Sequence, residues 1–181
     1  MNGRRGVAAV VAQTGLVAVV LGAVMGLVWW WVAPTGQWIV VDGGLAPADI
    51  GFTAWFAADA WFLVLGAVAG VLLAAISWRP GRHRPLALVV GVIVGAALIA
   101  LVAWALGGAL GAPDPQALAT TADPGTMLQG ALGIRAIGVV FGPALTSLTV
   151  LALLLSNARL DENGGRGSSP AADAGVPQQI W

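Results

Sequence analysis

The chain has 181 residues, of which 59% are hydrophobic and only 9% are charged, and its formal net charge is zero. Soluble domains carry about 25% charged residues. This chain is therefore too apolar to cover a water-facing surface, and we expect it to reside in a lipid bilayer. It contains no cysteine and one histidine, which excludes disulfides, cysteine-ligated metals and a haem held by two histidines of one chain. We expect no cofactor.

Four apolar stretches are each long enough to cross a hydrocarbon core about 30 Å thick, which requires roughly 20 helical residues. They lack the alternation of membrane strands, and helices satisfy their own backbone hydrogen bonds, so we predict an all-α, four-helix integral membrane bundle rather than a barrel. The first stretch is too long for the apolar part of a signal peptide, and we expect it to be retained. The predicted helices span about 7–32, 55–78, 86–110 and 136–155.

The arginines predict the orientation of these helices. Residues 79–85 read RPGRHRP, a short charged turn that makes the second and third helices antiparallel neighbours. All arginines except Arg135 fall on one side of this topology, and cytoplasmic loops of membrane proteins are enriched in arginine. We therefore predict that both termini and this turn are cytoplasmic, where Arg79, Arg82 and Arg84 would contact anionic lipid headgroups.

The two remaining loops are predicted on the outer side. In the first, about 33–53, QWIVVDGGL joins a β-branched run to a glycine-rich turn, which predicts a small hairpin. In the second, about 112–130, QALATTADPGTML predicts a short helical turn that ends at Pro124. Residues 1–156 would form one transmembrane domain. Residues 157–181, rich in Gly, Ser and Pro, are predicted to be a disordered cytoplasmic tail.

Tryptophans gather near the predicted outer ends of the helices. Tryptophan favours membrane interfaces because its ring is apolar while its N–H needs a polar partner. We interpret the residues as an anchoring aromatic belt, with a docking patch for lipid or a partner protein as the alternative. They are Trp29, Trp30, Trp31, Trp38, Trp55, Trp61 and Trp104.

Every predicted helix contains a Gly-x-x-x-Gly pair, a spacing that lets two helix backbones approach closely. Glycine is so abundant here that random placement gives a similar number of pairs. Their even spread favours packing within the bundle, with a dimer face as the alternative. The pairs are Gly22/Gly26, Gly66/Gly70, Gly91/Gly95, Gly107/Gly111 and Gly138/Gly142.

Several polar side chains and one proline lie inside the predicted helices. Pro143 predicts a kink in the fourth helix because it lacks a backbone N–H. The hydroxyl groups are expected to bond back to their own helix, and a polar path through the first and fourth helices is the alternative. The polar residues are Gln13, Thr14, Thr146, Ser147 and Thr149.

Asp59 and Arg135 are ionisable residues at the ends of predicted helices. From Asp59 to Trp78 a helix covers about 28 Å, which places Asp59 at the outer boundary of the membrane rather than at its midplane. It could complement the positive N-terminal end of its own helix, form an interhelical ion pair with Arg135, or bind a ligand or proton in an outward vestibule. Since a cation at a helix N-terminus opposes the dipole, Arg135 needs a compensating group, and Asp59 is the best candidate.

Three stretches within about residues 10–155 resemble the actinobacterial membrane proteins grouped as domain of unknown function 2567. They read GLVWWWVAP, IVVDGG and FAADAWFLVLGAVAGVLLAAISWRPGRHRP. The resemblance implies a four-helix protein of the actinobacterial plasma membrane, and it makes Asp59-Ala60-Trp61-Phe62 a family feature. It implies no activity.

Motifs of enzymes are missing from the sequence, including H-E-x-x-H, G-x-S-x-G and the phosphate-binding G-x-x-x-x-G-K. We therefore expect a non-enzymatic structural or accessory protein of the cell envelope. Its partners would be the lipid bilayer and another membrane or envelope protein, but not nucleic acid. The alternative is a small transporter or channel subunit with an outward-facing site at Asp59 and Arg135.

Overall fold

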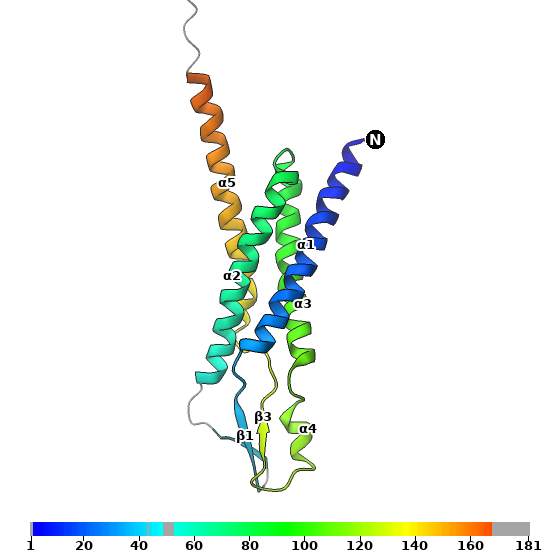
Figure 1. Ribbon diagram of the computed structural model, residues 1–181, viewed down its shortest axis with the longest axis vertical. Coiled ribbons are helices and arrows are strands. Elements are labelled where there is room, and N and C mark those ends of the chain that lie inside the picture. Colours follow the sequence, from blue (N-terminus) through cyan, green and yellow to red (C-terminus); the bar gives the residue numbers. More distant parts are fainter. Residues whose placement is uncertain (1, 43, 49–52, 168–181) are drawn as a thin grey trace, which may run out of the picture.

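The long helices of the protein stand side by side in a bundle (Figure 1). The computed structural model describes residues 2–42, 44–48 and 53–167, and for 2–7, 55 and 159–167 it describes the backbone alone. The N-terminal end of α1, the turn between α2 and α3, and the end of α5 lie at the same end of the bundle, and we call this the turn end. The opposite end carries the strands, and we call it the sheet end. The long helices are α1 (Asn2–Val32), α2 (Thr53–Gly81), α3 (Pro85–Leu110) and α5 (Gly142–Gly167), the last preceded by the 3-10 helix η1 (Ile137–Phe141).

Four helices in the described part of the chain are long and apolar enough to cross a membrane. This confirms the prediction of four such helices, and the architecture is compatible with a multi-pass membrane protein. The predicted neighbours α2 and α3 are joined by a tight turn, run in opposite directions and contact each other. The outward surfaces of α1, α2 and α3 are apolar, as a helix facing lipid requires, with large exposed side chains such as Leu16, Val68 and Leu101.

The last helix differs from its prediction at both ends. It was expected near 136–155, but the chain enters it through η1, and α5 continues to Gly167. Residues 157–167 of the predicted disordered tail are therefore helical, while 168–181 lie outside the described residues. The helix can continue because Ala158, Arg159 and Leu160 favour helix, and no proline occurs between Pro143 and Pro170.

The most extensive helix contacts join helices that are not consecutive: α1 packs along α3 and α2 packs along α5, each as a parallel pair. In the first pair, Gly22 and Gly26 lie directly on the α3 backbone. A methyl group added at Gly26 would come within 2.8 Å of the carbonyl oxygen of Ala103. In return, glycines of α3 make room for side chains of α1: Thr14 lies next to Gly91, and Ala18 lies next to Gly95.

In the second parallel pair, glycines of α2 lie against Pro143 near the start of α5. A methyl group at Gly66 would lie 3.0 Å from Pro143 Cδ, and one at Gly70 would lie 2.5 Å from its carbonyl oxygen. The glycines of both pairs thus allow close packing inside the bundle.

The hydroxyl groups of α5 bond back to the helix, as expected. Thr146 Oγ1 donates to the Gly142 carbonyl at 2.9 Å, Ser147 Oγ to the Pro143 carbonyl at 2.6 Å, and Thr149 Oγ1 to the Leu145 carbonyl at 2.8 Å. These bonds use carbonyl groups of the same helix, so the hydroxyls are already partnered along α5.

Beyond the helices, β1 (Gln37–Val41), β2 (Gly44–Pro47) and β3 (Met127–Gln129) form a three-stranded antiparallel sheet in the order β2-β1-β3. Trp38 of β1 lies opposite Pro47 on one side and opposite Leu128 on the other. The third strand comes from the second predicted loop, so the two loops form one structure. The short helix α4 (Pro115–Ala119) contacts β2 and β3. We call β1, β2, β3 and α4 the sheet cap.

A turn at Asp123-Pro124-Gly125-Thr126 leads into β3. The Thr126 N–H donates to the Asp123 carbonyl at 3.1 Å, and Gly125 has a φ of 90°. Proline followed by a glycine with positive φ is the pattern of a type II turn. The predicted helical turn precedes it as α4, and it ends before Pro124.

Candidate functional site

Asp59 lies in α2 near the sheet end, and only 5% of its surface is exposed. Its Oδ1 accepts a hydrogen bond from the backbone N–H of Arg135 at 3.2 Å, and its Oδ2 accepts one from the N–H of Ala136 at 2.8 Å. Ala136 is the N-cap residue of η1 and makes no capping bond with its own side chain. The carboxylate of α2 therefore satisfies donors at the start of the segment that leads into α5. We call this arrangement the latch.

The latch brings together the two residues predicted to join the second and fourth helices. The hydrogen bonds, however, involve the backbone of Arg135, and the ion pair between the two side chains stays a prediction. Asp59 also lies beyond the first turn of α2, which begins at Thr53. The dipole of its own helix, whose effect falls off within one turn, therefore does not explain its position. Backbone donors leave no signature in a sequence, so sequence analysis could not find this role.

Trp29 departs from the predicted aromatic belt because it is completely buried. Its Nε1–H donates to the Ala58 carbonyl at 2.9 Å, and its ring meets Phe62 edge-on with a centroid distance of 5.0 Å. The ring also lies against Gly107 of α3, where any side chain would collide with it. The N–H of Trp29 thus finds its polar partner inside the protein, next to the latch, instead of among lipid headgroups.

The other tryptophans of the predicted belt differ in their surroundings. Among those whose side chains the structure describes, Trp31 is the most exposed, with 81% of its surface accessible. Trp38 is half-buried in the sheet cap, and the side chain of Trp55 lies outside the described residues. The remaining exposed members are Trp30, Trp61 and Trp104. Their exposure fits an anchoring role, which stays a prediction.

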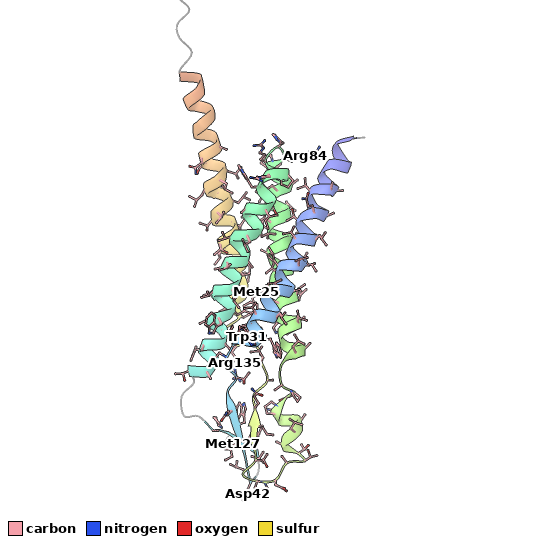
Figure 2. All side chains as sticks on the ribbon, in the orientation of Figure 1. Met25, Trp31, Asp42, Arg84, Met127 and Arg135 are labelled. Atoms are coloured by element: carbon pink, nitrogen blue, oxygen red, sulfur yellow. The ribbon has the colours of Figure 1, made fainter. Side chains whose placement is uncertain are left out.

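A cavity of about 530 Å³ lies between the sheet, α4 and the segment before η1. This volume falls in the range of small-ligand sites. Its walls are mostly apolar, and Figure 2 shows Arg135 where the sheet cap meets the bundle. Sequence analysis missed the cavity because its walls come from segments that are far apart in the sequence. The lining residues are Trp38, Gly44, Leu45, Asp114, Pro115, Gln116, Ala119, Thr120, Ala131 and Arg135.

Asp114 and Arg135 are the two charged residues that line this cavity. The Oδ1 atom of Asp114 accepts the backbone N–H of Gln116 at 3.0 Å and caps α4. Its second oxygen keeps its capacity to accept hydrogen bonds. The site therefore combines an anionic group, a cationic group and an aromatic ring in one partly enclosed space.

The predicted lipid-contacting arginines lie at the other end of the molecule. Arg79 and Arg82 are exposed and Arg84 is half-buried, and Arg82 Nε donates to His83 Nε2 at 3.2 Å. Figure 2 shows Arg84 at the turn end, far along the bundle from Arg135. The structure thus separates these cations as the positive-inside rule requires, while the side on which each end lies stays a prediction.

Comparisons with known proteins add no family to these observations. No family model matches the chain, and neither curated proteins nor solved structures give a match. The resemblance to actinobacterial membrane proteins therefore stays a prediction. Among the residues whose side chains the structure describes, no three His, Asp or Glu side chains are grouped as a metal site would require.

Proposed function

We propose that this chain is a non-enzymatic accessory protein of the bacterial plasma membrane. Both termini would be cytoplasmic, and the sheet cap would be an outward platform that contacts lipid or another envelope protein. The observation that carries the proposal is the latch: the buried carboxylate of α2 is engaged by the backbone of the segment that joins the sheet cap to α5. The arginine asymmetry and the resemblance to actinobacterial membrane proteins support the orientation and the location.

A platform must be held in a fixed orientation, and further bonds connect the two chain segments that lead into the sheet cap. Gln129 Nε2 donates to Thr35 Oγ1 at 2.8 Å, and the Gly130 N–H donates to the Gly36 carbonyl at 2.7 Å. The segment after α1 is thus bonded to the segment after β3, which the latch fixes to α2. These contacts support a sheet cap that keeps one position on the bundle.

The two faces of the sheet differ in what they meet. Trp38 and Leu45 line the cavity, and Leu128 shares their face because it pairs with Trp38. On the opposite face, Val41 and Met127 are 42% and 65% exposed. This face therefore presents apolar side chains to its surroundings, and it is the face that we propose a partner protein covers.

The same contacts favour this proposal over a transporter with a working Asp59. Both oxygens of Asp59 already accept backbone hydrogen bonds, and the hydroxyls of α5 bond to their own helix. A transport site needs polar groups that are available to a substrate, whereas these groups are engaged in the fold.

Single cysteines test the orientation cleanly, because the natural chain has none. Intact cells expressing Met127→Cys or Arg82→Cys are treated with a membrane-impermeant maleimide. We expect labelling of Met127→Cys only, with Arg82→Cys labelled after the membrane is opened. Labelling of Arg82→Cys alone in intact cells would reverse the proposed orientation.

A photo-cross-linker at position 127 tests the partner-facing role, with the same group at Leu16 as the matched control. Leu16 is similarly exposed, at 68%, but lies on the apolar surface of α1. We expect a discrete protein adduct from position 127 and only lipid adducts from position 16. Lipid adducts alone from both positions, together with purification as a partner-free monomer, would contradict the partner-facing role.

A further inference from the structure

We infer that the cavity between the sheet and α4 binds a zwitterion that carries a protonated amine and a phosphate. This is the chemistry of an aminophospholipid headgroup and also of a free amino-alcohol phosphate. The inference deepens the proposed function and rests on it for the outward position of the sheet cap. It is argued from three residues that line the same space, namely Arg135, Asp114 and Trp38.

The charges of the cavity select a ligand that carries both signs. A guanidinium has five N–H donors in a planar fork that matches phosphate oxygens, so Arg135 can hold a phosphate alongside its other contacts. Asp114 uses Oδ1 for Gln116, and its other oxygen can accept from an ammonium group. A bare anion would be repelled by Asp114 and a bare cation by Arg135, whereas a zwitterion pairs with both.

The walls of the cavity suit the same ligand. The Trp38 ring can contact an ammonium group through its π face, while Leu45, Pro115 and Ala119 form apolar walls. A volume of about 530 Å³ exceeds that of a headgroup alone, which leaves room for the glycerol and the first part of the acyl chains.

The cavity lies next to the ends of the apolar helices, at the level where lipid headgroups would lie. Arg135 lies just before an apolar span that begins at Ile137, and Asp114 follows the end of α3 at Leu110. Both charged groups are thus near the ends of hydrophobic segments, where the phosphates of a bilayer lie. The latch fixes the backbone N–H of Arg135, so the origin of its side chain is set before a ligand arrives.

The test measures binding by titration calorimetry to the full chain in maltoside micelles. The probes are dihexanoyl-phosphatidylethanolamine, dihexanoyl-phosphatidylglycerol, which lacks the amine, and free phosphoethanolamine. The variants are Arg135→Gln, which keeps the backbone bond to Asp59, and Asp114→Asn, which keeps an N-cap for α4. Asp123→Asn is the matched control, because Asp123 is exposed and does not line the cavity.

We expect phosphatidylethanolamine to bind about 10-fold or more tightly than phosphatidylglycerol, and each of the two variants to lose about 10-fold in affinity while the control binds as the natural chain does. Free phosphoethanolamine binding about 10-fold more weakly than the lipid assigns the site to lipid, and equal binding assigns it to a soluble ester. Equal affinity for the two lipids, unchanged variants, or no saturable binding would overturn the inference. If binding is absent while position 127 still cross-links a protein, the inference fails and the proposed function stands.

Discussion

The two parallel helix pairs of this bundle are held together by different means. Along α1 and α3, close packing extends from Thr14 beside Gly91 to the ring of Trp29 beside Gly107. Along α2 and α5, the glycines pack on Pro143, and the chain enters α5 through a 3-10 helix. The backbone N–H groups of Arg135 and Ala136, just before that 3-10 helix, need acceptors. Asp59 provides these acceptors. The difference teaches that this bundle places a carboxylate where backbone N–H groups of the neighbouring segment have no acceptor within their own helix.

Removal of the latch carboxylate should have the largest effect. Asp59→Ala removes two charge-assisted hydrogen bonds and leaves two partly buried N–H groups, so we expect a loss of about 3 kcal/mol in the free energy of unfolding. Asp59→Asn keeps one acceptor and should lose less. Denaturation in mixed micelles measures both, with the exposed Asp42→Ala as control. An Asp59→Ala variant as stable as this control would show that the latch does not stabilise the contact between α2 and α5.

Glycine substitutions should disturb both pairs to a similar extent. A methyl group at Gly26 or Gly70 would meet backbone atoms of the partner helix, so Gly26→Ala and Gly70→Ala should each cost about 2 kcal/mol. Gly15→Ala is the matched control, because nothing lies within 4 Å of that position, and it should be neutral or slightly stabilising. If all three variants behave like Gly15→Ala, close packing is not what joins the pairs.

Trp29 connects α1 to α2 beside the latch, and its loss should have an intermediate effect. Trp29→Phe removes the bond to the Ala58 carbonyl and part of the ring that fills the space beside Gly107. We expect a loss of about 1.5 kcal/mol in the free energy of unfolding, compared with almost none for the exposed Trp31→Phe. Equal stability of the two variants would mean that Trp29 stabilises the bundle no more than an exposed tryptophan of the predicted belt does.

The smallest effect is expected for the hydroxyls of α5. Thr149 is exposed and bonds to its own helix, so Thr149→Val should change the free energy of unfolding by less than about 0.5 kcal/mol. A larger loss would mean that a polar group contributes to α5 beyond the latch, and the contrast between the two pairs would have a second cause.

The four long apolar helices were predictable because their length and hydropathy leave few alternatives, and the charged turn made α2 and α3 neighbours. The parallel pairs were not predictable, since glycines as frequent as these do not show which helix each one faces. β3 is three residues long, too short for a pattern of its own. Its available signal was the Asp123-Pro124-Gly125 turn before it. The latch stayed hidden because Asp59 bonds to backbone N–H groups.

The most direct test of the account is a double-mutant cycle between Asp59→Ala and Arg135→Ala. Arg135→Ala keeps the backbone N–H that Asp59 binds. If the latch acts through the backbone, the loss caused by Asp59→Ala should be the same in both backgrounds to within about 0.5 kcal/mol. If Asp59→Ala costs nothing once the Arg135 side chain has been removed, the stabilisation comes from an ion pair and the account is contradicted.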